Sequence, residues 1–487
     1  MKQTKRFLFN ATIMMSTSLL LSSIGVWFNL YLSERLGAVG MGVFQLMSSV
    51  YTLAITFACS GIGLASTRMV AEEAVRQNGS IRGAMRRCLL YSGVFGLAAA
   101  AALWGSAGWI GLKWLGAAET IRPLRMMAVS MPFISCSSAL NGYFTAVRHV
   151  SKGAAAQILE QLLKVLLAIY ALELLVPDGL EAACFAITAA GVVAEGISGL
   201  LAYLLYLWDS RKSTAGNCQH LTRKLVGIAL PVAFSSYLRQ GLSTIKHLLV
   251  PIRLQVGGLS APAAIAVFGM VQGVALPVIL FPYAFFNAFN CLVVPELAQA
   301  HSRQRDVSDA VEQMLSMTLS CSMIVCGVLF YFSQEMGALV SHHPDIAIYI
   351  RLLAPVVPVM YLDTAVDSML KGLDEQLSVM QYNIIDALSS LAAVWLLLPF
   401  WGIKGYVLII CISEVLNFSL SIGKLSQVSR FRLDLTHQLV RPFLCAAIAV
   451  VTSGLLRLWL SAGAQTMGIL LMGVSGCIYI LLLRLTR

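Results

Sequence analysis

Two cations, Arg239 and Lys246, lie well inside the mostly apolar stretch at residues 222–252. Arg239, Ser243 and Lys246 are spaced by four and three residues, which places them along one face of a helix. A cation in hydrocarbon costs at least about 2.5–3.5 kcal/mol on insertion scales, so it persists where it faces water or a partner. The stripe suits an anionic ligand such as a pyrophosphate. The alternative is that both cations pair with acids on neighbouring helices.

Carboxylates and amides also lie inside later apolar stretches. They are Asp363, Asp367, Asp386, Glu414 and Asn417. Carboxylates at membrane depth could carry protons or sodium in a coupled transporter. They could equally neutralise the two cations or pair structurally, and the pattern favours that second interpretation.

The roles of two further pairs of polar residues stay open. Glu160 and Lys164 are spaced as i and i+4 in the stretch 154–176, the favourable order for an ion pair. This pair is either a clamp between helices or a contact with substrate. Gln272 and Asn287 lie in the stretch 262–294, where several prolines predict kinks beside a cavity. We therefore include both amides among the candidate cavity residues.

The composition identifies the elements that must position these groups. Of the 487 residues, 58% are hydrophobic and 12% are charged, whereas soluble domains have roughly 45–50% and 25%. The chain is therefore an all-α polytopic membrane protein. Its net charge of +11 does not indicate nucleic-acid binding, because the basic residues gather in short loops between apolar runs, as the positive-inside rule predicts.

Apolar runs long enough to span a bilayer number fourteen, with a turn expected at Trp401 and Gly402. An even number places both termini on one side. With that side in the cytoplasm, the inward segments hold 23 of the 34 basic residues and the outward loops hold 8. The sequence therefore predicts a multi-pass plasma-membrane protein with both termini cytoplasmic. The expected spans are 10–33, 41–66, 88–112, 123–147, 154–176, 181–208, 222–252, 262–294, 311–333, 346–370, 379–400, 403–424, 438–460 and 465–484.

The chain resembles itself at a shift of 224 residues. Val43-Phe44 falls on Val267-Phe268, and Glu72 falls on Glu296. The shift covers six spans, so the repeats have the same orientation in the membrane. We expect two six-helix lobes, residues 1–210 and 211–430, followed by two extra helices in 431–487. Transporters built this way bind substrate between the lobes and open alternately to each side.

Catalysis within the chain is not expected. The loops are too short for a catalytic domain, and the sequence has no Walker motif, HExxH, GxSxG or Gly-rich phosphate loop. Nearly all of the cysteines lie inside apolar runs as small core residues. We therefore predict no catalytic residues, no metal site and no cofactor.

Several segments resemble one membrane-protein superfamily. They are GIGLASTRMVAEEA from Gly61, the most specific segment QILEQ at 157–161, and VVPELAQA from Val293. The chain resembles the multidrug/oligosaccharidyl-lipid/polysaccharide flippase superfamily, and within it the stage V sporulation protein B and polysaccharide-biosynthesis branch, over essentially its whole length. The resemblance implies a V-shaped, MATE-like fold with alternating access in a prokaryotic plasma membrane. Relatives often carry arginines in the first helix; this chain has none there, and Arg239 and Lys246 are the candidates to replace them.

These observations predict an alternating-access flippase for a lipid-linked saccharide, which is an undecaprenyl-linked polysaccharide unit or a peptidoglycan precursor. The expected partners are this substrate, membrane lipid and a coupling Na⁺ or H⁺, with no nucleic acid, and the expected state is a monomer. The main alternative is a Na⁺- or H⁺-coupled multidrug exporter of the same superfamily. A membrane enzyme acting on lipid-linked sugars, or a scaffold for such enzymes, is a third hypothesis.

Overall fold

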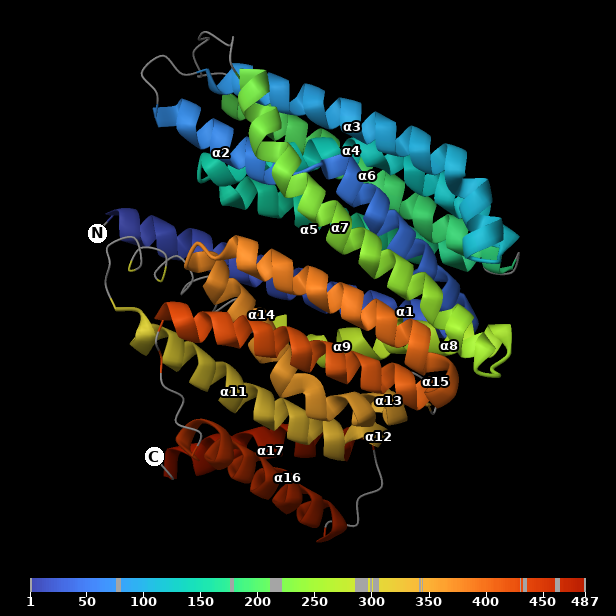
Figure 1. The fold of residues 1–487 in the computed structure, drawn as a ribbon, viewed down its shortest axis with the longest axis vertical. Helices are drawn as coiled ribbons and strands as arrows, with labels where there is room; N and C mark the ends of the chain where they lie inside the picture. Colours follow the sequence, from blue (N-terminus) through green and yellow to red (C-terminus); the bar gives the residue numbers. More distant parts are fainter. Residues whose placement is uncertain are drawn as a thin grey trace. The chain divides into compact units, whose positions relative to one another are not determined.

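The computed structural model of this chain describes residues 2–75, 80–175, 179–210, 221–284, 297, 300, 306–340, 343, 345–429, 431, 436–459 and 465–485. Every regular element in these ranges is a helix (Figure 1). A helix satisfies its backbone hydrogen bonds internally, which hydrocarbon requires of any spanning segment. The all-α prediction is confirmed.

The chain forms two compact units. Unit 1 comprises Met1–Phe28 and Val39–Leu248, and unit 2 comprises Asn29–Ala38 and Leu249–Arg487. Each unit is therefore built from two separate pieces of chain, because residues of the long first helix belong to both. The division expected at residue 211 rests on the sequence repeat and stays a prediction about that duplication.

Unit 1 packs around α2, α3, α4 and α6. Its core contains Met69, Met85, Leu140 and Phe144, which are almost completely buried. Burial of these side chains fixes the helices that carry the polar groups described below. The helices are α1 (Lys2–Cys59), α2 (Ile62–Val75), α3 (Ile81–Trp109), η1 (Ile110–Trp114), η2 (Ala118–Thr120), α4 (Ile121–Ala146), α5 (Val150–Leu175), α6 (Leu180–Ser210) and the greater part of α7 (Leu221–Val256).

Helix α7 is fastened to α1 and to the turn that follows α1. Thr244 donates to the Ser49 carbonyl at 3.1 Å, and the Tyr237 ring lies 4.4 Å from the Phe57 ring, centre to centre. Near Gly61 the backbones almost touch, since a Cβ there would lie 2.6 Å from the Ala229 carbonyl oxygen. Residues 221–248 therefore belong to unit 1, although the repeat assigned this span to the second lobe.

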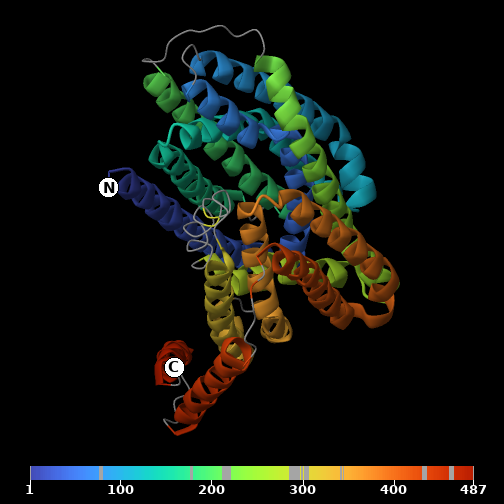
Figure 2. The same cartoon turned by 60° about the vertical axis from the view of Figure 1, so that its left-hand side comes forward.

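Unit 2 has its core between α11, α14 and α15, and α16 and α17 pack against each other and against α11 (Figures 1 and 2). Val366, Met369 and Leu425 are fully buried in this core. The helices are α8 (Ala261–Met270), η4 (Val271–Ala275), α9 (Leu276–Leu280), α11 (Ser308–Tyr331), α12 (Ser333–Val340), α13 (Asp345–Leu353), η5 (Ala354–Val356), α14 (Val357–Gly372), α15 (Gln376–Ser429), η6 (Thr436–Val440), α16 (Arg441–Trp459) and α17 (Gln465–Leu485).

Nine helices of the described residues are long and apolar enough to cross a membrane. Two of these stretches, of 60 and 54 residues, are much longer than the roughly 20 residues that one crossing needs. Each contains a glycine with positive φ, Gly37 at 68° and Gly402 at 54°, where the helix direction breaks. The turn expected at Gly402 is confirmed, while the exact number of fourteen spans stays a prediction.

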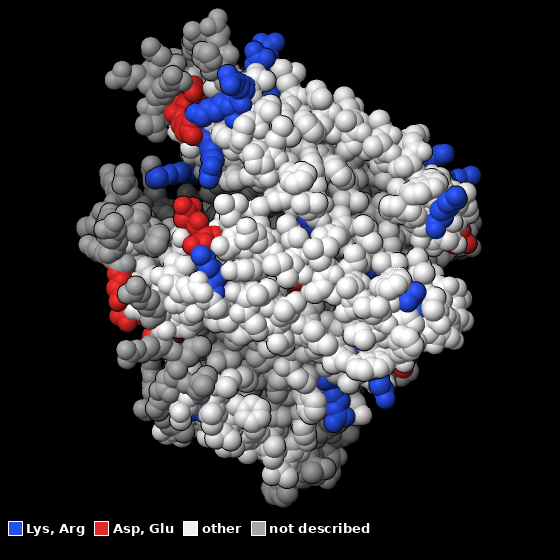
Figure 3. All heavy atoms as spheres, viewed as in Figure 1, with Lys and Arg blue, Asp and Glu red and all other residues white. Residues whose placement is uncertain are grey.

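The surface and the backbone both fit helices that cross hydrocarbon. The face seen in Figure 3 is mostly free of charge, and its Lys, Arg, Asp and Glu side chains gather toward helix ends. Inside unit 2 the regular helix changes to a π-helix at Val271–Ala275, just before Pro277. Proline has no N–H for the usual hydrogen bond, so a change of register beside it is expected.

Candidate functional site

The cation stripe lies on α7. Arg239 is exposed, Ser243 and Lys246 are half-buried, and neither cation makes an ion pair with a residue that the structure describes. The predicted pairing of these cations with acids is therefore not seen in the described part of the chain. The next cation along the helix, Arg253, donates from Nη2 to the Trp395 carbonyl at 2.6 Å and is thereby occupied within unit 2.

The two amides predicted beside a cavity have different outcomes. Gln272 lies in the π-helix η4, and its Nε2 donates to the Tyr406 hydroxyl at 2.8 Å. Tyr406 is buried, so this hydrogen bond commits the Gln272 amide nitrogen to the interior of unit 2. Asn287 lies outside the described residues.

Unit 1 contains a polar cavity of about 650 Å³. Five helices of the unit contribute to it: α1, α2, α4, α5 and α6. Its lining is formed by Leu21, Cys59, Gly63, Thr67, Ile134, Ser137, Ser138, Asn141, Gly142, Thr145, Gln157, Glu160, Gln161 and Glu195. Amide, hydroxyl and carboxyl groups dominate this list, although the surrounding bundle is apolar.

Hydroxyl groups of neighbouring helices hold the two carboxylates of the cavity. Ser198 donates to Glu160 Oε2 at 2.9 Å. The Tyr51 hydroxyl lies 3.0 Å and 3.2 Å from the two oxygens of Glu195, and 2.7 Å from the Ser130 hydroxyl. Glu195 is only 8% exposed, so these hydrogen bonds replace the water that a carboxylate would otherwise bind.

The ion pair predicted between Glu160 and Lys164 does not form. Glu160 instead accepts a hydrogen bond from Ser198 on α6. The Lys164 side chain lies against Gly191, where a Cβ added to the glycine would be 3.9 Å from the lysine Cε. Because glycine leaves room at that point, the lysine packs across α6 instead of pairing along its own helix. The clamp between α5 and α6 therefore exists, but a hydroxyl donor provides it.

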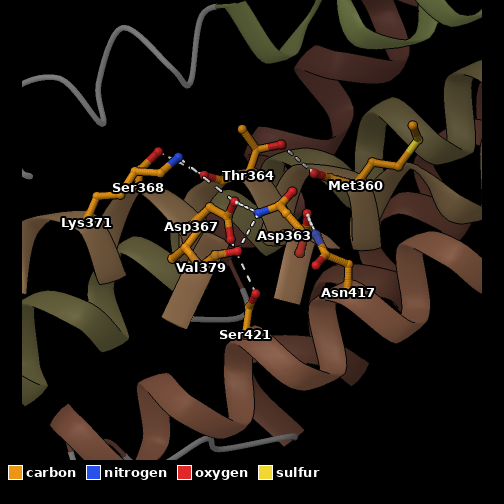
Figure 4. A network of polar contacts seen from close by, with 10 residues as sticks. Met360, Asp363, Thr364, Asp367, Ser368, Lys371, Val379, Asn417 and Ser421 are labelled. Atoms are coloured by element: carbon orange, nitrogen blue, oxygen red, sulfur yellow. Dashed lines mark hydrogen bonds and ion pairs between the residues drawn. The ribbon is translucent and has the colours of Figure 1, made fainter. Parts of the chain in front are cut away.

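In unit 2 the predicted acids of α14, Asp363 and Asp367, lie in a network of polar contacts with side chains of α15 (Figure 4). Asn417 donates to Asp363 Oδ2 at 2.9 Å. Asp367 accepts hydrogen bonds from the Asn383 amide at 3.2 Å and from the Ser421 hydroxyl at 3.3 Å. The Lys371 ammonium lies 4.0 Å from the same carboxylate. The four-residue spacing on α14 and the kink at Gly402, which brings both parts of α15 against α14, together assemble the network.

The remaining predicted acids, Asp386 and Glu414, lie on α15. Asp386 accepts a hydrogen bond from Ser413. Glu414, the residue after Ser413, is half-buried. Asp363, Asp367 and Asp386 thus accept hydrogen bonds from amides and hydroxyls of their own unit.

One pair of oxygens in the network lacks a donor. Asp363 and Asn417 are 8% and 6% exposed, and the Oδ1 atom of each is buried without a hydrogen-bond partner among the described residues. Buried acceptors nearly always find a donor. A proton on Asp363, or a bound cation, would give these oxygens the partner that they lack among the described residues.

Several residues of these sites did not stand out in the sequence. Tyr51, Ser130 and Ser198 orient the carboxylates of the cavity, and Asn383 joins the acid network. Serine and tyrosine are common in apolar helices, so their positions gave no signal. The acid Glu195 and the mid-helix amide Asn141 could have been found as polar groups at membrane depth.

Comparisons with known proteins agree with this architecture. The family model described as polysaccharide biosynthesis protein matches residues 7–285, and the MatE model matches residues 231–396. Stage V sporulation protein B of Bacillus subtilis (strain 168) is 24% identical over 506 residues, covering 100% of this chain and 96% of that protein.

Solved structures of similar fold are transporters. The lipid II flippase MurJ in an inward closed conformation superposes with a TM-score of 0.72 at 12% identity, covering 96% of this chain and 98% of MurJ. An inward-facing multidrug resistance MATE family transporter of the MOP superfamily gives a TM-score of 0.67 at 14% identity, covering 87% and 100%.

The fold is that of a multi-pass helical membrane protein, and it is shared with the solved structures of a lipid flippase and of a multidrug transporter. The match over residues 7–285 extends through more than half of the chain. The chain belongs to the polysaccharide biosynthesis protein family.

Proposed function

We propose that this protein is a flippase that moves an anionic lipid-linked saccharide from the inner to the outer leaflet by alternating access. The observation that carries the proposal is the pair Arg239 and Lys246 on α7, two cations with no ion-pair partner among the described residues. They would receive the pyrophosphate while the lipid tail stays in the bilayer. The similarity to stage V sporulation protein B and the MurJ fold supports this substrate class.

The membrane potential would favour movement in this direction. An inside-negative potential drives an anion outward, and each charge gains about 2.3 kcal/mol per 100 mV. A pyrophosphate with roughly two charges would gain about 4–5 kcal/mol. That free energy is sufficient to bias the cycle if no compensating ion is carried.

A flipping assay in liposomes tests the proposal. The protein is reconstituted with a fluorescent undecaprenyl-pyrophosphate saccharide, and quenching by an impermeant reagent reports how fast the headgroup appears outside. We expect Arg239→Ala with Lys246→Ala to slow flipping at least about tenfold, as the loss of 1.4 kcal/mol or more would. The matched control removes two exposed cations of α3, Arg86→Ala with Arg87→Ala. Equal rates in the two double variants would refute the cation stripe.

A second candidate function is a cation-coupled multidrug exporter, and the acid network of unit 2 favours it. Asp363 and Asn417 present unpartnered buried oxygens, which a coupling H⁺ or Na⁺ would complete. The MatE match covers all of α14, including Asp363, and the first part of α15. Efflux of ethidium driven by an imposed Na⁺ or H⁺ gradient, and lost in Asp363→Asn, would support this function. Flipping of the lipid-linked saccharide without such efflux would support the first.

A further inference from the structure

The size of the unit 1 cavity is that of a small-molecule site. Its volume of about 650 Å³ lies within the roughly 300–1,000 Å³ of typical ligand pockets. A single water occupies about 30 Å³ of liquid, so the space is much larger than one ion needs. The cavity therefore suits an organic molecule, or a polar part of one.

The charges of the cavity disfavour a phosphate. Glu160 and Glu195 line it, and none of the described lining residues is Lys or Arg. A phosphate here would meet like charges in a partly desolvated site, where repulsion is stronger than in water. The anionic part of a pyrophosphate-linked substrate has no counter-charge among these residues.

The hydrogen-bonding capacity of the cavity matches a polyhydroxyl compound. The single Tyr51 hydroxyl lies within reach of both oxygens of Glu195, and Ser198 donates to one oxygen of Glu160, so both carboxylates already have a neutral donor. The side-chain amides of Gln157 and Gln161 have no hydrogen-bond partner among the described residues. Each amide offers two donors and an acceptor, which neighbouring sugar hydroxyls can use together.

We propose that the unit 1 cavity binds the uncharged saccharide portion of the substrate through Gln157, Gln161 and the free oxygen of Glu160, and that it excludes phosphate. This assignment rests on the proposed flippase function for the identity of the substrate. It separates the recognition of the sugar, inside unit 1, from the recognition of the pyrophosphate by the cations of α7. Selectivity for the saccharide would then be set by α4, α5 and α6.

Binding of tail-free probes to the purified full chain in detergent tests the assignment. The probes are the uncharged disaccharide N,N′-diacetylchitobiose (called chitobiose below), inorganic pyrophosphate and tetramethylammonium, and binding is measured by saturation-transfer NMR or calorimetry. We expect chitobiose to bind saturably and to bind about tenfold more weakly to Gln157→Leu with Gln161→Leu. The matched control is Gln376→Leu, an exposed glutamine at the start of α15, which should bind as wild type does.

The conservative variant Glu160→Gln separates a sugar site from a cation site, because it keeps the shape and a carbonyl acceptor. Chitobiose binding within a few-fold of wild type supports the proposal. Tetramethylammonium binding that disappears in Glu160→Gln overturns the proposal. It is also overturned if pyrophosphate still competes with chitobiose for binding when the α7 cations are removed by Arg239→Ala with Lys246→Ala. Chitobiose binding that is equal in wild type and the glutamine double variant also overturns it.

The flipping assay keeps the two proposals apart. Wild type that binds chitobiose at the cavity but does not flip the lipid-linked saccharide refutes the flippase function alone. Wild type that flips, with a glutamine double variant that flips equally fast, refutes the saccharide site alone.

Discussion

Buried carboxylates occur in both units, but the two units satisfy them differently. In unit 1, Glu160 and Glu195 receive hydroxyl donors from other helices and leave a cavity beside them. In unit 2, Asp363 and Asp367 share one helix and accept hydrogen bonds from Asn417 and Asn383 respectively, and one oxygen of Asp363 has no donor among the described residues. Hydroxyls can rotate to donate, whereas an amide that donates with its nitrogen also brings an acceptor oxygen. The difference suggests a binding role for unit 1 and a proton or cation role for unit 2.

The largest expected effect separates these roles by transport. We expect Asp363→Asn to reduce the stimulation of ethidium efflux by an imposed H⁺ or Na⁺ gradient. The expected reduction is at least about tenfold, equivalent to about 1.4 kcal/mol. Glu195→Gln should retain most of that stimulation, because Glu195 already accepts the Tyr51 hydroxyl and leaves no buried oxygen without a partner among the described residues. Flux in proteoliposomes with and without the gradient measures both. Similar losses in the two variants would remove the distinction between the units.

The same pair of substitutions should have opposite effects on stability. Glu195→Gln removes a charge that accepts the Tyr51 hydroxyl, and we expect a cost of about 1–3 kcal/mol. Asp363→Asn introduces an N–H donor on a side chain that has an unpartnered oxygen, and we expect a gain of about 0.5–1.5 kcal/mol. Denaturant titration in detergent measures the free energy of unfolding. Changes of equal sign would show that the unpartnered oxygen has no energetic consequence.

Removal of one donor from unit 1 should have a smaller effect. Tyr51→Phe deletes the hydroxyl that reaches both oxygens of Glu195, and we expect it to lower the free energy of unfolding by about 0.5–1.5 kcal/mol. Tyr170→Phe is the matched control, since that ring is 71% exposed and should tolerate the change. Equal stability of the two variants would mean that Tyr51 does not hold the carboxylate.

The smallest effect is expected at the edge of the acid network. Lys371 approaches Asp367 at 4.0 Å, but its side chain is 52% exposed. Pairs of this kind contribute about 0–0.5 kcal/mol, because water screens them and the lysine loses rotamer freedom. Lys371→Ala should therefore leave the unfolding transition nearly unchanged. A loss above about 1 kcal/mol would place Lys371 among the residues that neutralise the network.

Much of the architecture could be predicted from the sequence, because hydrocarbon imposes simple demands on a chain. Apolar runs of sufficient length become helices, and a glycine between two such runs becomes a turn, as at Gly402. The spacing of Asp363 and Asp367 likewise placed them on one face of one helix. The repeat could not show that α7 packs along unit 1, since that depends on close contacts such as Gly61 with Ala229.

The candidate site was predictable in residue type and only partly in pairing. Lys164 and Glu160 have the spacing of an ion pair, yet the space above Gly191 and the nearby Ser198 directed them to different partners. Gln272 was expected beside a cavity, and its nitrogen instead donates to Tyr406.

The amino-acid sequence by itself determined that this is a multi-pass helical membrane protein, and which helices carry polar groups. It did so because helix formation and burial in lipid depend on local composition and period. Only the tertiary structure decided which hydroxyl or amide donates a hydrogen bond to each carboxylate, and where a cavity remains. Those outcomes depend on how closely helices distant in the chain approach one another, and small residues at the crossing points set that approach.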